Sequence, residues 1–233
     1  MDKKDYYNIE KNIDKINRGE YTNFLDQSIY KKICYKLKKY NYNIYYPYKD
    51  SDKLIIYTKV FPEVKLLEIL SYDKLTHREI MGSLYGLNIN SEMFGDIIIW
   101  NDHYYIIVMS SIYDLVLKEY NKVGNHNIKI KEQPIDILDN YIRTYQSVEL
   151  IVSSLRIDQI ISKIIGTSRE NVKDKFKNNE VILNYEICHK LNYNIHKDDV
   201  FSIRKYGKYK YIDIIKQNKK GNYLIKLDKY IDN

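Results

Sequence analysis

The 233-residue chain is poor in the residues that mark several large classes of protein. Its two cysteines, Cys34 and Cys188, lie far apart and cannot form the disulfide framework of a small secreted domain. No run approaches the roughly 18 apolar residues of a membrane span, and the first residues lack the apolar core of a signal peptide. We therefore expect a cytoplasmic protein that does not bind membranes.

Motifs that would indicate catalysis are also missing. The sequence has neither a glycine-rich strand-to-helix fingerprint for a dinucleotide or S-adenosylmethionine nor a phosphate-binding loop with its Lys and Ser/Thr. The five histidines are scattered, and Cys188-His189 lacks two further ligands at usable spacing for zinc. We expect no cofactor, no metal and no catalytic residue.

One group of residues keeps an enzymatic alternative open. His77, Glu79 and Asp96 could form a metal or acid/base cluster. The plainer interpretation is that Thr76 and Glu79 form a capping box at the start of a helix and that Asp96 lies at a strand edge. The alternative is an RNA-modifying enzyme, similar to a pseudouridine synthase or of another kind, with its site in residues 60–132.

The distribution of charge is more informative than the composition. The abundance of Lys, Ile, Asn and Tyr, with 26 tyrosines, is what a nucleotide-biased genome would produce without selection for binding. Residues 153–233, however, contain 17 Lys and Arg against 10 Asp and Glu, whereas residues 1–152 contain 21 of each. The whole formal charge of +7 therefore lies in the last third, as in a module that binds a polyanion. The alternative is a solvated basic face.

The basic third begins with two short amphipathic helices. Apolar residues at helical spacing predict a first helix from Ser154, as N-cap, to Gly166. Thr167 and Glu170 stand in capping-box spacing for a second helix that closes at residues 178–179. Arg169, Lys173 and Lys177 are four residues apart and predict one solvent-facing cationic stripe. Strands are expected at 181–184 and 200–204, followed by alternating basic and tyrosine residues at 204–211.

Upstream, the pattern predicts small α+β units. Leu25, Ile29, Ile33 and Leu37 indicate an amphipathic helix, followed by strands at 42–48, 54–58 and 64–70. A helix at 76–88, strands at 95–100 and 104–109 joined by an Asn-Asp turn, a helix at 111–120 and a strand at 127–131 come next. Residues 134–147 read as a linker, and 148–152 as a strand. The fold class is therefore α+β, with an N-terminal helical and plait-like domain at 1–73, a second small α+β domain with linker at 74–147, and a basic domain at 148–233.

Several stretches of the last third resemble the S-four RNA-binding domain of ribosomal small-subunit protein four, pseudouridine synthases and bacterial tyrosyl-tRNA synthetases. That domain has two helices and a small antiparallel sheet. The stretches that carry the resemblance are residues 153–158, 168–169, 181–184, 199–200 and 204–208.

The sequence is further similar to the YlmH family of S-four-domain proteins. These carry an Arg-Gly-aromatic-Gly-Arg turn where this chain has residues 204–208, and a segment similar to residues 77–79 and 95–98. Together the matches cover roughly residues 64–220. Asn179, Asp198 and Lys205 stand where the family has glycine, and Lys208 where it has arginine.

The resemblance implies a non-enzymatic protein that binds rRNA or tRNA at the large ribosomal subunit, in quality control of stalled subunits carrying peptidyl-tRNA. A cell-division-linked adaptor is a further alternative. We expect no sequence-specific DNA binding. Asp158, in an Arg-x-Asp setting that pseudouridine synthases use for catalysis, is better interpreted as orienting Arg156. The residues expected to contact RNA are Arg78, Arg156, Arg169, Lys173, Lys177, Asn184, Arg204, Lys205, Tyr206, Lys208 and Tyr209.

Overall fold

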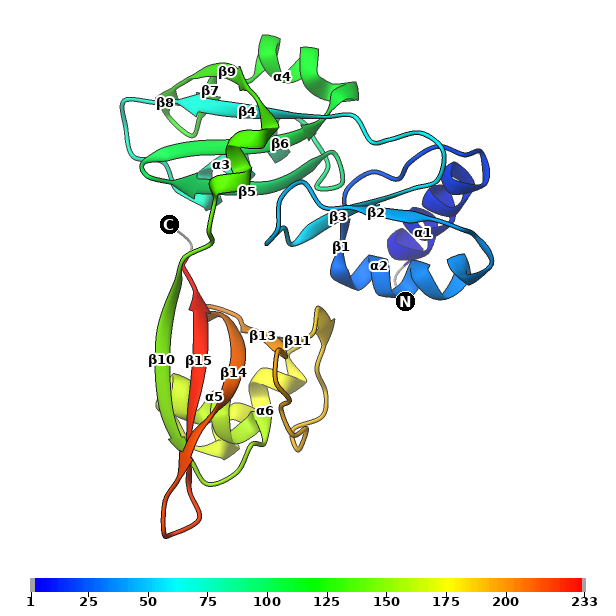
Figure 1. Ribbon diagram of the computed structural model, residues 1–233. Helices are drawn as coiled ribbons and strands as arrows, with labels where there is room; N and C mark the ends of the chain where they lie inside the picture. The colour runs from blue at the N-terminus through cyan, green and yellow to red at the C-terminus, as the bar shows by residue number, and fades with distance from the viewer. Residues whose placement is uncertain (1–2, 232–233) are drawn as a thin grey trace. The chain divides into compact units, whose positions relative to one another are not determined.

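The computed structural model describes residues 3–231 and divides them into two compact units (Figure 1). Unit 1 extends to Arg143, and unit 2 comprises Thr144–Ile231. Both mix helices with antiparallel sheets, so the predicted α+β class is confirmed. The predicted domain limits at 73/74 and 147/148 would have to be tested by folding of the separate fragments, and they stay predictions. Within residues 3–231, no helix is both long and apolar enough to span a membrane.

The first part of unit 1 packs two helices against a three-stranded sheet. The helices are α1 (Lys3–Asn17) and α2 (Gln27–Lys36), the latter extended by the 3-10 turn η1 (Leu37–Lys39). The strands β1 (Leu25–Asp26), β3 (Lys53–Tyr57) and β2 (Asn43–Tyr45) lie in that order. Helix α2 corresponds to the helix predicted from Leu25, but it begins two residues later. The Asp26 carboxylate caps it by accepting a hydrogen bond from the Ile29 amide, so Leu25 lies in β1. Helix α1 was not predicted, although its Ile9 and Ile16 are buried.

The second part of unit 1 is a plait. Strand β4 (Val64–Leu70), helix α3 (His77–Gly86), β5 (Phe94–Trp100), β6 (His103–Met109), α4 (Tyr113–Glu119) and β9 (Lys129–Gln133) follow one another, and the sheet order is β5-β6-β4-β9. This is the split βαβ arrangement. The 3-10 turn η2 (Ser110–Ile112) precedes α4, and the short hairpin of β7 (Lys122–Val123) and β8 (His126–Asn127) follows it. The predicted capping box of Thr76 and Glu79 is confirmed.

Both faces of the plait sheet carry apolar side chains. On one face, Leu67 and Ile106 pack with Ile80 of α3 and Val116 of α4. The opposite face is covered in part by the N-terminal segment and by the 3-10 helix η3 (Ile135–Asn140), which forms within the predicted linker. The buried side chains of the sheet on this second face are Leu66, Ile98, Tyr105, Ile107 and Met109. The covering segments contribute Phe24, Tyr48, Ile55 and Leu138.

A carboxylate in β5 joins three segments of unit 1. The Asp96 Oδ2 atom accepts hydrogen bonds from the Tyr48 hydroxyl (2.6 Å), the Ser51 hydroxyl (3.0 Å) and the Asp52 amide (2.8 Å). Arg143 donates to Asp52 (2.7 Å) and to the Tyr48 hydroxyl (2.9 Å). Asp96 thus lies within β5, and its contacts give it an architectural role in unit 1.

Unit 2 is a six-stranded antiparallel sheet with two helices packed on one face (Figure 1). Helix α5 (Ile157–Ile165) and helix α6 (Arg169–Lys177) bury Ile160, Ile161 and Phe176 against the sheet. Residues beyond 211, for which no structure was predicted, complete the long hairpin of β14 (Gly207–Gln217) and β15 (Tyr223–Tyr230). The strand order is β10 (Tyr145–Val152), β15 (Tyr223–Tyr230), β14 (Gly207–Gln217), β13 (Val200–Ile203), β11 (Val181–Leu183) and β12 (Glu186–Ile187).

Both predicted helix starts in unit 2 were wrong by one or two residues. The N-cap of α5 is Arg156 rather than Ser154, and its side chain makes no capping bond. For α6, Ser168 replaces Thr167 as N-cap, because the Ser168 hydroxyl accepts a hydrogen bond from the Asn171 amide (3.3 Å). The predicted end of α5 at Gly166, in left-handed conformation with φ 73°, is confirmed.

Three residues that stand where the resembled family has glycine adopt left-handed backbone conformations. Their φ angles are 57° at Asn179, 69° at Asp198 and 74° at Lys205. Asn and Asp tolerate this region because their short side chains hydrogen-bond locally, whereas Lys does not. The chain therefore keeps the turn geometry and accepts strain at Lys205.

We expect Lys205→Gly to raise the free energy of unfolding of unit 2 by about 0.5 to 1 kcal/mol, because glycine removes the left-handed penalty but loses more backbone entropy on folding. Urea denaturation measures the change. Lys208→Gly, in the interior of β14, is the matched control and should lower stability. A loss of stability in Lys205→Gly would contradict the assignment of strain.

Candidate RNA-binding surface

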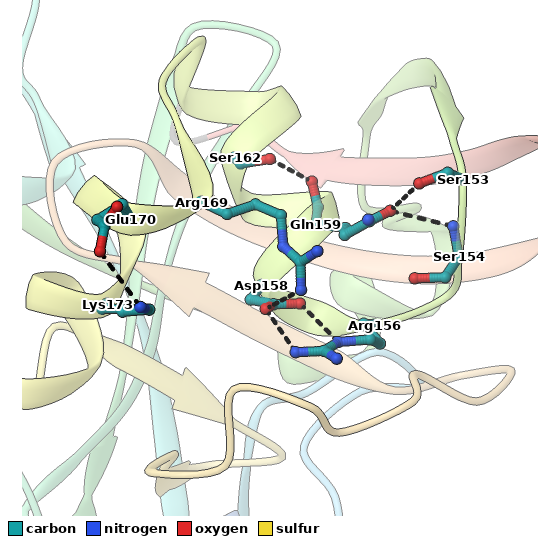
Figure 2. Close-up of polar contacts among 9 residues, drawn as sticks. All are labelled: Ser153, Ser154, Arg156, Asp158, Gln159, Ser162, Arg169, Glu170 and Lys173. Atoms are coloured by element: carbon teal, nitrogen blue, oxygen red, sulfur yellow. Dashed lines mark hydrogen bonds and ion pairs between the residues drawn. The ribbon is translucent and has the colours of Figure 1, made fainter.

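The best-organised cationic site in unit 2 is built around a buried carboxylate. Asp158, in the first turn of α5, is 3 % exposed. Arg156 donates to both carboxylate oxygens (Nε–Oδ1 3.1 Å, Nη2–Oδ2 2.8 Å), and Arg169 of α6 donates to Oδ2 (2.8 Å). Figure 2 shows both guanidinium groups converging on Asp158. The predicted pairing with Arg156 is confirmed, whereas the contact from Arg169 was not foreseen.

Backbone contacts fix the start of α5 and hence Asp158. The amides of Ile157 and Asp158 donate to the carbonyls of Tyr193 (2.8 Å) and Leu191 (3.3 Å), which satisfies donors that have no partner inside the helix. Just before the helix, the Ser153 hydroxyl and the Ser154 amide donate to the Gln159 side chain (Figure 2). These contacts hold the chain at Arg156, so its side chain meets the carboxylate two residues later.

The two arginines also control the charge state of Asp158. Burial alone would raise the pKa of this carboxyl, but the hydrogen bonds and charges of Arg156 and Arg169 outweigh it and lower the pKa. Their side chains remain 38 % and 45 % exposed. One carboxylate thus positions two guanidinium groups that still face solvent, and the cluster keeps a net positive charge. Forked guanidinium donors of this kind match the geometry of a phosphate.

Exposed lysines continue this surface along α6. Lys173 lies 3.5 Å from Glu170 and Lys177 lies 3.8 Å from Asp174, and all four side chains are more than half exposed. Ion pairs of this kind contribute little, because water screens them. Both lysines can therefore exchange their carboxylate partners for phosphates without a large loss of stability.

The turn at residues 204–206 lies beside the last residues of α6. The Arg204 amide donates to the Glu180 carbonyl (3.0 Å), and Lys175 bonds Glu180 (2.6 Å). The Lys175 ammonium also lies 5.8 Å from the centre of the Tyr206 ring. The Glu180 pKa is lowered, first by the hydrogen bond from Lys175 and further by the charges of Arg204 and Lys205. Arg204, Lys205 and Tyr206 are exposed and stay candidates for RNA contact.

Three expected contact residues have other contacts in the structure. Tyr209 is 4 % exposed and stacks on Phe201 in the core, so it cannot meet RNA. The Asn184 side chain bonds Asp199 (2.7 Å) and the Val200 amide (3.0 Å), and it therefore holds the turn after β11. Because successive residues of a strand alternate faces, Lys208 lies on the sheet face opposite α5 and α6. There its ammonium lies 5.1 Å and 4.3 Å from the ring centres of Tyr185 and Tyr230.

The remaining candidates belong to unit 1. Arg78 is exposed in the first turn of α3. Glu79 caps that helix, and its pKa is lowered by the hydrogen bonds from Thr76. Asp96 is held by the partners described above. Among residues 3–231, no group of three or more His, Cys, Asp and Glu side chains could hold a metal ion.

Comparisons with known proteins agree with this architecture. Residues 62–136, which include the plait, match the family described as "Putative RNA-binding domain in YlmH". The chain is 26% identical over 156 residues to the "Ribosome-associated protein quality control protein P2" of Bacillus subtilis (strain 168). That match spans 66% of this chain and 60% of the relative. The "Cell division protein ylmH from Streptococcus pneumoniae" matches in fold with a TM-score of 0.50 at 17% identity, over 60% of this chain and 97% of that one.

The fold and these matches define an α+β protein that contains a domain of a putative RNA-binding family. Residues 62–136 thus match a family model of YlmH proteins, and the chain is similar in sequence and in fold to the two proteins named above. The family match lies in unit 1, whereas the basic surface predicted from the sequence to bind RNA lies in unit 2.

Acidification should reveal the role of Asp158. Because its pKa is lowered in the folded state, its contribution to stability is complete above its unfolded pKa of about 3.9 and is lost as pH falls through the folded value. We expect Asp158→Asn to cost about 2 kcal/mol at pH 7 and much less at a pH below the folded pKa of Asp158. Urea unfolding, followed by hydrogen exchange of the α5 amides, measures both. Asp174→Asn, at an exposed position, is the control; an equal cost of Asp158→Asn at both pH values would refute the pairing.

Proposed function

We propose that this protein is a non-enzymatic RNA-binding protein that acts on rRNA or tRNA at the ribosome. The observation that carries the proposal is the pair of half-exposed arginines held on the buried Asp158 carboxylate. This pair lies in the part of the chain that contains its whole excess of positive charge. Positioned guanidinium groups beside exposed lysines are suited to phosphates of structured RNA, which proteins recognise mainly by backbone geometry.

The biological setting that we propose is the rescue of stalled large subunits that carry peptidyl-tRNA. Its support is the name of the Bacillus subtilis relative, which associates that protein with the ribosome and with protein quality control. The match covers 60% of the relative, so the activity of that whole protein is extended to this chain as a proposal. We further propose that the protein acts in the cytoplasm.

The enzymatic alternative places an RNA-modifying site in residues 60–132. Glu79 and Asp96, two of its three candidate residues, have architectural partners, which favours the non-enzymatic proposal. Modification analysis of total RNA from a deletion strain separates the two. A missing modification that is restored by the wild-type protein but not by His77→Ala would overturn our proposal.

The binding surface can be tested by charge removal on α6. We expect Lys173→Gln with Lys177→Gln to lower affinity for tRNA and large-subunit rRNA at least tenfold at moderate salt. The slope of log affinity against log salt should flatten by at least one, because each phosphate contact contributes about 0.7 to 0.9. Filter binding across a salt series measures both quantities.

Lys118→Gln with Lys122→Gln is the matched control, because it removes the same charge from exposed positions of unit 1. Equal losses from both pairs would show that net charge governs binding. Binding that hardly responds to salt would instead favour a protein-interaction adaptor, as in the cell-division alternative. Crosslinking in cells, followed by sequencing, identifies the RNA: tRNA and large-subunit rRNA support the proposal, and scattered mRNA contradicts it.

A further inference from the structure

The plait sheet of unit 1 leaves half of one face uncovered. The face opposite α3 and α4 carries Glu68 of β4, Tyr105 of β6 and Lys131 of β9, which the strand register places side by side. Toward one end of this face, Leu66 and Ile107 are buried beneath apolar side chains that include Phe24 and Leu138. Toward the other end, Trp100 lies directly opposite His103 and packs on Tyr141 (5.7 Å between ring centres), so the exposed part of the face lies along β4 and β9 and at His103.

The uncovered half exposes a mixture of apolar, aromatic and basic groups. Leu70 is 42% exposed, and Lys129, directly opposite it on β9, is exposed together with Lys131. His103 begins β6 two residues before Tyr105, so both side chains lie on this face. The His103 side chain is 56% exposed.

The His103 ring is held in a fixed orientation. Its Nδ1 atom lies 2.6 Å from Glu68 Oε1, and Gln133 donates to Glu68 Oε2 (2.5 Å). The ring also stacks on Tyr105, with 6.1 Å between ring centres and 19° between planes. Glu68 is 5% exposed; burial would raise its pKa, but hydrogen bonds from His103 and Gln133 outweigh that effect and lower it. A buried, ionised carboxylate therefore fixes an imidazole whose ring remains half open to solvent.

We propose that this open half-face, formed by Leu70, His103, Lys129 and Lys131, binds an unpaired stretch of RNA. A base would stack on the His103 ring, and adjacent phosphates would meet the two lysines. Ring platforms on the strands of a four-stranded sheet accept unpaired bases, because the bases of a duplex are already stacked on one another. The lysines of β9 lie two strand spacings from β6, about 10 Å, within reach of neighbouring phosphates.

Charge decides between RNA and a protein partner. The half-face carries two exposed lysines against one carboxylate, and that carboxylate is buried and already bonded to His103 and Gln133. A polyanion with planar rings satisfies both the cations and the stacking surface, whereas an apolar peptide would leave the lysines unpaired. The inference rests on the proposed RNA-binding function and adds a base-stacking surface in unit 1 to the phosphate-binding surface of unit 2.

The test uses the full chain and an eight-nucleotide oligouridylate, with fluorescence anisotropy as the readout. We expect His103→Ala to lower affinity roughly tenfold through lost stacking, and His103→Phe to retain most of it. Lys129→Gln with Lys131→Gln should flatten the salt slope by about 1.4, because each single-strand phosphate contact contributes about 0.7. The far-UV circular dichroism melting transition of each variant establishes that it is folded.

Two matched controls lie in the same unit. His126→Ala removes another imidazole that is paired with a carboxylate, 2.8 Å from Asp73, and Lys118→Gln with Lys122→Gln removes two exposed lysines. Neither should change oligouridylate affinity. Lys173→Gln with Lys177→Gln should lower the affinity for structured RNA and leave the affinity for the oligonucleotide unchanged. Failure of the unit 2 surface and failure of this half-face therefore give different results.

Three results would overturn the proposal. Wild-type protein that does not bind oligouridylate at moderate salt would show that the half-face is no RNA site. Equal losses from the control and test pairs would show binding by net charge alone. Loss of binding in His103→Phe as large as in His103→Ala would show that stacking is not the interaction.

Discussion

A carboxylate withdrawn from water must be paired, and the organisation of unit 2 follows from this requirement at Asp158. Breaking a buried ion pair by removing one partner is far more costly than losing a surface pair, because the remaining charge stays desolvated. The pairing with Arg156 and Arg169 ties the start of α5 to the start of α6. Folding of the two helices and presentation of the cations are therefore coupled, and the same constraint recurs at Asp96 and Glu68 in unit 1.

The sequence was sufficient where a local pattern determines the structure. Helices α3, α5 and α6 follow from apolar spacing, and the turn at Asn101 and Asp102, with φ of 52° and 61°, follows from residues that tolerate the left-handed region. Helix α1 was missed because its apolar residues are sparse among charged ones. Strand β14 was missed beyond residue 211 because register shifts interrupt its alternation, between Tyr211 and Asp213 and again between Ile214 and Lys216.

The candidate site shows the limit of the same reasoning. Alternation along a strand separates two faces but does not say which is buried, so Tyr209 seemed as available as Tyr206 until the helices were placed. Arg169 bonds Asp158, which lies eleven residues earlier and on the other side of a turn. Residue spacing within one helix cannot predict a contact between two helices. The open half-face of the plait depends on strand order and on which end of the sheet is covered, neither of which the sequence specifies directly.

The pairing of the first and last strands of unit 2 has a consequence for its place in the chain. Tyr145 is directly opposite Tyr230, and their rings meet edge to face at 5.1 Å between centres. The chain therefore enters and leaves unit 2 through adjacent positions of one strand pair. A body with neighbouring ends can be inserted into a surface loop of another protein or circularly permuted without stretching its backbone. Unit 2, with its candidate RNA-binding surface, therefore has ends that suit transfer into another protein as one piece.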